Sequence, residues 1–385
     1  AHMLVVATTV LIIACPCALG LATPMSVMVG IGKAAEMGML VRKGDALQQA
    51  SKLTTIVLDK TGTLTLGRPE VTDLFPSSDL NQNQLLMLAG SLEQGSEHPL
   101  AEAIVHRTQQ QSLDLKPVSG FSAIPGQGVQ GTVGGQNLFL GNQKLMTSKG
   151  IVTDEFSVTA LKLAEQGKTP IFLARNQKLA GLIAVADPMR EDSPAAIKRL
   201  HSLGIKIVML TGDNERTARA IASQAGIDAF YAEVLPTDKA RQVETFQKQG
   251  ETVGMAGDGI NDAPALAQAD AGFAIGTGTD VAIESADITL MRASLHGLAD
   301  AVELSRASMS NIRQNLFGAF IYNTLGIPIA AGALYPLTGM LLNPVIAGAA
   351  MALSSVTVVS NANRLRLFKP SFIKTNAHSE RKGEQ

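Results

Sequence analysis

Residues 55–65 read Thr-Ile-Val-Leu-Asp-Lys-Thr-Gly-Thr-Leu-Thr, and this stretch decides the fold of the chain. The four residues before Asp59 favour a strand, whereas Lys60-Thr61-Gly62 after it favours a turn. The pattern predicts a strand with its carboxylate at the carboxyl edge of a parallel sheet, where open α/β folds place their ligands. We interpret Asp59 as a nucleophile. The alternative, an aspartate that only caps a turn, would account for Asp-x-Thr-Gly alone but poorly for the longer string.

Two later strand ends carry acidic loops of the same kind. Thr211-Gly212-Asp213 follows the apolar run 206–210, and Gly257-Asp258-Gly259-Ile260-Asn261-Asp262 follows 252–256. A parallel sheet would bring both loops to the edge that holds Asp59. There Asp59 and Asp258 would hold Mg²⁺, which favours carboxylates together with phosphate oxygens and water. Lys239 would supply the fixed positive charge that phosphoryl transfer requires.

The apolar residues of this 385-residue chain gather at its two ends. The segment from Met3 to about Gly32 is long enough to cross a bilayer, and about Leu316–Leu334 and Pro344–Val359 predict a second and a third span. By the positive-inside rule, the basic residues near the last two spans place the central part and the tail in the cytosol. These residues are Arg306, Arg313, Arg364, Arg366, Lys369 and Lys374. A net charge of −1 gives no indication of a nucleic-acid partner.

The central part divides by character into an α/β unit and an insert. Residues 71–186 contain a Gly-rich run at 125–131 and Gln-rich helical stretches, whereas both flanks alternate short strands with helices. We expect a membrane helix with a cytosolic extension at 1–41, the α/β domain at 42–70 and 187–305, and the insert at 71–186. Two membrane helices at 306–362 and a basic tail at 363–385 follow.

The only cysteines, Cys15 and Cys17, flank Pro16 inside the first apolar segment. Residues two apart on a regular helix point to different sides, but Pro16 removes a helical hydrogen bond and lets the two thiols converge. Sulfur ligands favour Cu⁺, and polar groups at membrane depth are usually functional. The plainer alternative is that both cysteines serve as small apolar residues and that Met351, in the last span, only packs.

The order of these motifs resembles that of the P-type ATPases, whose phosphorylation domain belongs to the haloacid-dehalogenase-like superfamily. Tyr322-Asn323 and Met351-Ala352-Leu353-Ser354-Ser355 resemble the copper-exporting branch of the heavy-metal (type IB) pumps of Gram-negative bacteria. Zinc, cadmium and lead pumps carry a carboxylate in the last span, and residues 316–360 contain none. The resemblance implies an α/β, Rossmann-like phosphorylation domain with an inserted α+β nucleotide-binding domain, flanked by transmembrane helices.

The resemblance also implies ATP as substrate, Mg²⁺ as cofactor and an aspartyl phosphate on Asp59. The implied catalytic residues are Asp59, Lys60, Thr61, Thr211, Gly212, Asp213, Lys239, Asp258, Asn261 and Asp262, of which Asp59, Thr61 and Asp258 would hold Mg²⁺. His98 would contact adenine and Glu93 would orient it. The implied nucleotide-binding residues are Glu93, Glu97, His98, Gly126, Gly128, Val129, Gly141 and Asn142. The implied ligands of the transported ion, Cu⁺ or Ag⁺, are Cys15, Cys17, Tyr322, Asn323, Met351 and Ser355.

Thr61 is a departure with a mechanistic meaning. Soluble phosphatases of the superfamily carry a second aspartate there as general acid/base, so we expect the aspartyl phosphate of this chain to hydrolyse slowly. The family's N-terminal metal-binding domains, early spans and actuator domain with its Thr-Gly-Glu loop are missing. We therefore expect a fragment that binds nucleotide and phosphorylates itself without transporting.

Three other interpretations remain open from the sequence. The chain could be a membrane-tethered phosphatase of the haloacid-dehalogenase type, a Zn²⁺ or Cd²⁺ pump, or a module that only binds nucleotide or metal. For the copper interpretation we expect a protein of the bacterial inner membrane that contacts lipid and a cytosolic copper chaperone.

Overall fold

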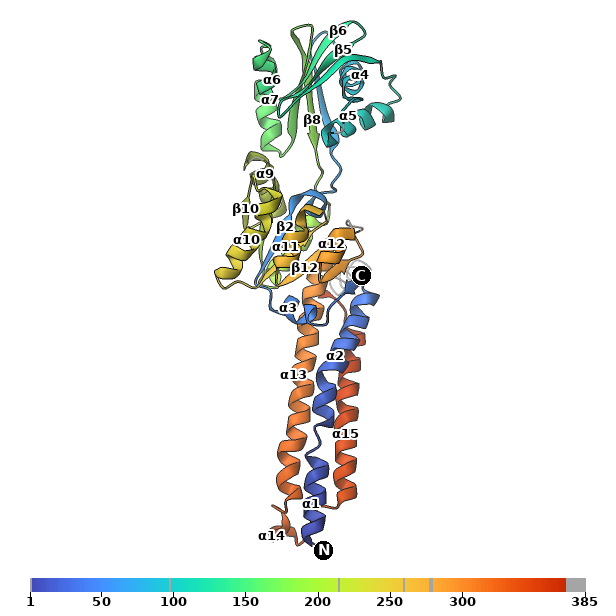
Figure 1. Cartoon of the computed structure of the whole chain (residues 1–385), viewed down its shortest axis with the longest axis vertical. Helices are drawn as coiled ribbons and strands as arrows, with labels where there is room; N and C mark the ends of the chain where they lie inside the picture. Colours follow the sequence, from blue (N-terminus) through green and yellow to red (C-terminus); the bar gives the residue numbers. More distant parts are fainter. Residues whose placement is uncertain (1, 97, 214, 259, 277–279, 372–385) are drawn as a thin grey trace, which may run out of the picture.

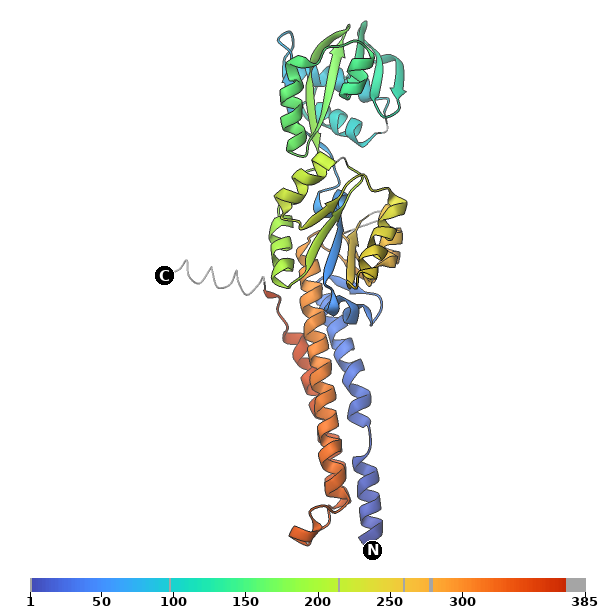
Figure 2. The ribbon, with the colours of Figure 1, turned by 90° about the vertical axis from the view of Figure 1, so that its left-hand side faces the viewer.

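The computed structural model describes residues 2–96, 98–213, 215–258, 260–276 and 280–371. Two β-sheets lie one beyond the other along the long axis of the molecule, and a bundle of long helices extends from the far side of the second sheet (Figures 1 and 2). We call them the upper sheet, the large sheet and the bundle.

The large sheet has the strand order β1-β13-β12-β11-β2-β9-β10. All neighbouring strands are parallel except β1, which pairs antiparallel with β13 at the edge. The strands are β1 (Met39–Val41), β2 (Thr55–Asp59), β9 (Lys206–Leu210), β10 (Ala229–Tyr231), β11 (Val253–Gly257), β12 (Ala271–Ile275) and β13 (Ile288–Leu290). Every residue of β2 and β11 is buried, which explains their continuous apolar runs. The predicted parallel α/β sheet is confirmed.

Helices cover both faces of the large sheet. Ile56 and Leu58 of β2 face one core, with α3 (Ala46–Lys52), α8 (Ser193–Ser202), α9 (Glu215–Ala225) and the start of α13 (His296–Ala330). Val57 faces the other core, with α10 (Pro236–Lys248), α11 (Ala263–Gln268) and α12 (Asp280–Ser285). Strand β2 is therefore enclosed on both faces and paired on both edges.

The upper sheet is antiparallel, in the order β3-β8-β7-β6-β5-β4. Its strands are β3 (Glu70–Pro76), β4 (Val118–Ile124), β5 (Gly128–Val133), β6 (Gln136–Gly141), β7 (Thr169–Arg175) and β8 (Lys178–Ala186). Helices α4 (Gln82–Glu93) and α5 (Pro99–Gln110) pack against one core, and α6 (Gln143–Ser148) and α7 (Asp154–Glu165) against the other. The sheet is thus inserted into the chain between β2 and β9.

Two of the expected domain limits differ from the structure. Residue 41 ends β1, which belongs to the large sheet, and residue 305 lies within α13. Helix α13 begins among core residues of the large sheet and continues into the bundle without a break (Figure 1).

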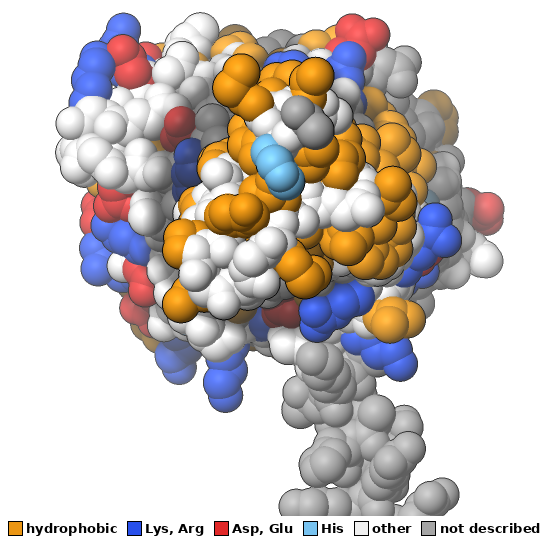
Figure 3. All heavy atoms as spheres, turned by 90° about the horizontal axis from the view of Figure 1, so that it is seen from below, with side chains coloured by type: hydrophobic (Ala, Val, Ile, Leu, Met, Phe, Trp, Pro, Cys, Tyr) orange, Lys and Arg blue, Asp and Glu red, His pale blue; other side chains and the backbone are white. Residues whose placement is uncertain are grey.

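The bundle contains α1 (His2–Ile13), α2 (Cys17–Glu36), α13 and α15 (Pro344–Asn363), joined at its far end through α14 (Tyr335–Thr338), and a short turn, Arg364–Leu367, follows α15. Seen end-on, it is covered mainly by apolar side chains, with charged side chains around the periphery (Figure 3). By length and composition, two segments of the described chain suit a membrane span: His2–Glu36, interrupted at residues 14–16, and Pro344–Leu367.

The third predicted span, Leu316–Leu334, is shorter than expected. Helix α13 ends at Ala330, two residues after Pro328, and Gly332 then takes a positive φ of 94° as the chain turns. The prediction overlooked that the apolar part of this helix is only the last portion of a longer, partly polar helix. It packs beside the other two spans at Ala319, against Ala18 of α2 and Val358 of α15.

A buried polar network joins three helices of the bundle. Ser26 of α2 donates to Asn311 Oδ1 of α13 at 2.8 Å, and Asn315 Nδ2 of α13 donates to Ser26 Oγ at 2.9 Å. Asn361 Nδ2 of α15 donates to Asn315 Oδ1 at 2.9 Å, and Asn311 Nδ2 donates to the carbonyl oxygen of Asn361 at 2.8 Å.

Candidate active site

Asp59 lies at the carboxyl end of β2, and the loop after it is folded tightly beneath Asp258. Gly62 takes a φ of +72°, and a Cβ atom there would lie 1.6 Å from Asp258 Oδ2. Only glycine allows both the backbone conformation and the position of the carboxylate above it.

Arg190 holds the same loop from the other side. Its Nη2 donates to the carbonyl oxygen of Gly62 at 2.8 Å, its Nε to that of Thr63 at 3.1 Å, and its Nη1 to that of Ala293 at 3.1 Å. Sequence reasoning missed this residue, although it follows β8 closely, where the chain returns from the upper sheet.

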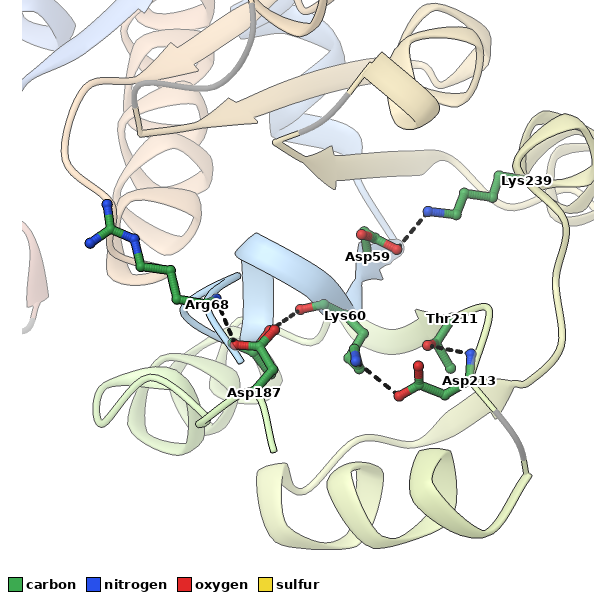
Figure 4. A network of polar contacts seen from close by, with 8 residues as sticks. Asp59, Lys60, Arg68, Asp187, Thr211, Asp213 and Lys239 are labelled. Carbon is green, nitrogen blue, oxygen red and sulfur yellow. Dashed lines mark hydrogen bonds and ion pairs between the residues drawn. The ribbon is translucent and has the colours of Figure 1, made fainter. Parts of the chain in front are cut away.

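Asp187, also missed, ties the outgoing and returning segments together. It accepts hydrogen bonds from Thr65 Oγ1 at 2.5 Å and from the backbone N–H of Arg68 at 3.1 Å (Figure 4 shows the contact with Arg68). A charged residue directly after the apolar strand β8 was the only signal that could have indicated it.

Lys239, in the first turn of α10, joins two carboxylates. Its Nζ lies 2.6 Å from Asp59 Oδ1 and 2.7 Å from Asp262 Oδ1, and all three residues are buried (Figure 4 shows the contact with Asp59). Burial alone would lower the pKa of Lys239, but Asp59 and Asp262 outweigh it and raise that pKa. The ammonium group therefore remains charged.

The carboxylates of Asp59, Asp258 and Asp262 form a cluster, with one oxygen atom of each within 4.8 Å of the others. Burial, together with the charge of Asp262, raises the pKa of Asp59 to about 7, although Lys239 opposes the shift. Burial and Asp262 also raise the pKa of Asp258. One lysine thus leaves the cluster with excess negative charge, and hard oxygen donors of this kind fit Mg²⁺.

The loop 211–213 supports the site through Lys60. The backbone N–H of Asp213 donates to Thr211 Oγ1 at 3.1 Å, and Asp213 Oδ2 lies 2.9 Å from Lys60 Nζ (Figure 4). Thr211 and Lys60 are buried. Lys60, the residue after Asp59, is therefore an anchor for this loop.

The structure brings most of the predicted catalytic residues together at one sheet edge. Asp59, Lys60, Thr211, Asp213, Lys239, Asp258 and Asp262 take part in the contacts above. Thr61, Gly212 and Asn261 are exposed at the rim of the same edge, next to these residues in the chain. Thr61 was predicted to assist in holding Mg²⁺. Asp262 was not among the predicted Mg²⁺ ligands, but its carboxylate belongs to the cluster with Asp59 and Asp258.

The upper sheet carries a cavity of about 400 Å³. Of the predicted nucleotide-binding residues, those lining it are Glu93, His98, Gly126, Gly128, Val129, Gly141 and Asn142. Glu97 lies outside the described residues. Leu100, Ile124, Leu140 and Ile171 give the cavity apolar walls.

Glu93 contributes to this cavity a carboxylate oxygen that has no hydrogen-bond partner among the described residues. It is 8% exposed, and its Oε2 atom accepts no hydrogen bond from any residue that the structure describes. Burial raises the pKa of Glu93 to about 7, and a hydrogen bond from Ser96 opposes the shift. A buried carboxyl of this kind is ready to receive a hydrogen bond from a ligand.

The glycines of the cavity have a different immediate role from the one the resemblance implied. Gly128 of β5 faces Gly141 of β6, and a Cβ atom on either would lie 2.2 Å from a carbonyl oxygen, that of Leu140 or Gln127. These two glycines thus let strands β5 and β6 approach each other, whereas the resemblance implied only that they let the backbone approach a nucleotide.

Asn142 is a positioning residue for the wall of the cavity. Its Nδ2 donates to the carbonyl oxygen of Gly126 at 2.9 Å, and its Oδ1 caps α6 by accepting from the N–H of Leu145 at 3.1 Å.

In the bundle, Cys15 and Cys17 lie at the break between α1 and α2 and are joined as a disulfide, with their Cα atoms 5.4 Å apart. Their sulfur atoms therefore lie at one point, where reduction would leave two adjacent thiols. On one side of this break, Ala18 packs with Ala319 and Val358. On the other side, Ile13 packs with Ala330 and Ala347.

The remaining predicted copper ligands lie between these two layers. Tyr322 and Asn323 fall between Ala319 and Ala330 along α13, and Met351 and Ser355 fall between Ala347 and Val358 along α15. Met351 is buried, Asn323 and Ser355 are half-buried, and Tyr322 is exposed. The four residues thus share the level of the helix break.

Known proteins are similar to the central part of the chain and to nearly its whole length. Residues 53–270 match the family of haloacid dehalogenase-like hydrolases. The chain is 55% identical to a copper-exporting P-type ATPase of Vibrio cholerae over 371 residues, which are 96% of this chain and 40% of that protein. It is 52% identical to copper-transporting ATPase 2 of Rhizobium meliloti over 368 residues, which are 96% of this chain and 44% of that protein.

Among solved structures, a crystal structure of a zinc-transporting PIB-type ATPase in the E2.Pi state superimposes with a TM-score of 0.81 at 39% identity. The match covers 92% of this chain and 56% of that one. The chain thus spans less than half the length of these curated relatives. The chain belongs to the haloacid dehalogenase-like hydrolases, and nearly its whole length is similar to part of the copper-transporting P-type ATPases.

Proposed function

We propose that this chain is the catalytic portion of an ATP-driven pump that exports Cu⁺ through an aspartyl phosphate on Asp59. The observation that carries the proposal is the buried pair of Asp59 and Lys239 within a carboxylate cluster at a sheet edge. A cavity suited to a nucleotide and a pair of sulfur atoms inside the bundle occur in the same chain.

In the proposed reaction a carboxylate oxygen of Asp59 attacks the γ-phosphorus of ATP. A new phosphorus–oxygen bond forms at Asp59, the bond to the β-phosphate oxygen breaks, and ADP leaves. Lys239, fixed by Asp59 and Asp262, lies where it can offset charge on the transferring group. Lys60 keeps the loop of Thr211 against the site through Asp213.

Asp59 and Asp258 would hold Mg²⁺, with Asp262 close by and the backbone at Thr61 as a further candidate. When bound, the ion would offset the charge of the phosphate oxygens and favour the ionised form of these carboxyls. The pKa of Asp59, raised to about 7, supports a site that is incomplete without a cation.

The cavity of the upper sheet would hold the adenosine of ATP. Glu93 offers a buried acceptor to an amino group such as that of adenine, and His98 at the start of α5 would contact the base. Because the cavity and Asp59 belong to different sheets, the two sheets must approach each other during transfer. Thr61, in place of a second aspartate, would keep the resulting phosphate long-lived.

The cargo would be bound at the helix break. Reduced Cys15 and Cys17 with the thioether of Met351 form a soft set that suits Cu⁺ and also Ag⁺. The absence of carboxylates from residues 316–360 argues against Zn²⁺ or Cd²⁺ as cargo. We place the bundle in the bacterial inner membrane with both sheets in the cytosol, where a copper chaperone would deliver the ion.

The test is acid-stable labelling of the chain with γ-phosphate-labelled ATP and Mg²⁺. We expect label on the unaltered chain that hydroxylamine removes, as it does from acyl phosphates, and no label on Asp59→Asn. Asp79→Asn, an exposed change in the upper domain, serves as the matched control and should keep the label.

Label that persists in Asp59→Asn would refute the nucleophile. Rapid hydrolysis of a generic phosphate ester, independent of ATP, would instead support the tethered phosphatase. Stimulation of the whole protein by Zn²⁺ but not by Cu⁺ or Ag⁺ would refute the choice of cargo.

A further inference from the structure

A second hollow, of about 670 Å³, lies between the upper sheet and the large sheet. Helix α7 of the upper domain meets α9 of the large-sheet domain beside it, where a Cβ atom on Gly167 would lie 3.3 Å from the side chain of Ile221 (Figure 1). The wall of the hollow thus comes from two domains.

This hollow continues the cavity of the upper sheet. Asn142, Thr169 and Pro170 line both. At its other end lies Glu233, whose backbone N–H donates to the carbonyl oxygen of Asp213 at 2.9 Å. Asp213 in turn binds Lys60, the residue after Asp59, so the hollow extends from the predicted adenosine site toward the loop that supports Asp59.

Two cations line the hollow from opposite domains: Lys144 on α6 and Arg216 on α9. Both side chains are exposed, and neither forms an ion pair with any other residue among those described. Glu215, which also lines the hollow, is engaged by Arg219 at 2.6 Å. Lys144 and Arg216 therefore outweigh the remaining acid, Glu233.

We propose that Arg216 and Lys144 bind the β- and γ-phosphates of ATP in this hollow and direct the γ-phosphate toward Asp59. The proposal rests on the nucleotide-binding function proposed above. Arg216 acts from the large-sheet domain and Lys144 from the upper domain, so a triphosphate that contacts both would also hold the two domains together. A nucleoside monophosphate is too short to contact the hollow in the same way.

The test measures equilibrium binding of ATP and AMP to the full chain, carrying Asp59→Asn to prevent transfer. We expect Arg216→Ala and Lys144→Ala each to weaken ATP binding about tenfold, the size of one charge-assisted hydrogen bond. AMP binding should change less than about twofold, and Arg216→Glu should weaken ATP binding more than Arg216→Ala does.

Lys149→Ala is the matched control, because this cation lies just after α6 but does not line the hollow. The inference is overturned if the double variant binds ATP as the parent does, or if ATP and AMP weaken equally. If the parent binds neither ATP nor AMP, the nucleotide function itself fails, whereas an unchanged ratio of the two affinities overturns only the phosphate site.

Discussion

At the scale of single residues, the site depends on charges that only partly offset one another. Lys239 joins Asp59 and Asp262, while Asp258 lies over Gly62 without a cation of its own at hydrogen-bond distance in the described chain. The sequence predicted these aspartates because each follows a strand of the same sheet. It could not predict Arg190 or Asp187, because their contacts cross from the end of the insert to the loop after β2.

Gly62 provides a sharp test of the geometry around Asp258. In Gly62→Ala the new Cβ would occupy the place of the Asp258 carboxylate, so that side chain must move. Because small displacements in such sites cost about 100-fold in rate, we expect phosphorylation of Asp59 to fall by that order. Gly135→Ala has a similarly positive φ of 77° with no atom within 4 Å, and should keep the activity. A Gly62→Ala chain that labels at the normal rate would contradict the placement of Asp258.

Glu93 makes stability depend on pH. Burial raises its pKa from 4.5 to about 7, so the folded chain holds a proton that the unfolded chain has lost between these values. The contribution of Glu93 to the free energy of unfolding is therefore full below about pH 4.5, declines as the pH rises to about 7 and stays low above it. At about 1.4 kcal/mol per pKa unit, the decline is of order 3 kcal/mol.

The measurement is the free energy of unfolding of Glu93→Gln and its parent across this range. The parent should lose stability relative to the variant between pH 4.5 and about 7 and run parallel to it above. The exposed change Glu102→Gln should show no such divergence. Parallel curves for Glu93→Gln throughout would mean that Glu93 is not a buried acid.

At the scale of elements, the bundle combines apolar helices with one buried polar layer. The sequence predicted the break at Pro16, because proline and the paired cysteines are local signals. It overestimated the apolar helix after Leu316, since an apolar run does not reveal where a helix ends. The polar layer of Ser26, Asn311, Asn315 and Asn361 was not predicted, because its members lie on three separate helices.

We expect Asn315→Leu to loosen the bundle by about 1–2 kcal/mol, because it removes the hydrogen bonds that Asn315 forms with Ser26 and Asn361. Faster hydrogen exchange of the amides in α2 and α15 would report the loss. Asn363→Leu, an exposed change at the end of α15, is the matched control. Unchanged exchange in Asn315→Leu would show that the network contributes little.

At the scale of the whole molecule, binding and transfer are assigned to separate sheets. The proposed nucleotide cavity belongs to the upper sheet and Asp59 to the large sheet, and their connection runs through two adjacent segments tied by Asp187. Such a connection favours rotation of one sheet against the other rather than independent movement.

We therefore expect ATP to shorten the distance between spin labels at Gln143→Cys, on α6 of the upper domain, and Arg241→Cys, on α10 of the large-sheet domain. The chain would carry Asp59→Asn, with Cys15 and Cys17 replaced by serine. Adenosine, which lacks phosphates, should leave the distance unchanged. The same distribution with and without ATP would mean that the domains do not close.

Helix α13 has one further consequence. It begins in the core of the large sheet and continues past Asn323, at the level of Cys15 and Cys17. From His296 to Asn323 it spans about 40 Å, at 1.5 Å per residue. A stiff arm of that length amplifies: a tilt of about 5° at the sheet moves its far end by about 3.5 Å, enough to separate an ion from its ligands. If Asp59 is phosphorylated as proposed, a movement of the large sheet would therefore reach the level of Cys15 and Cys17 through α13.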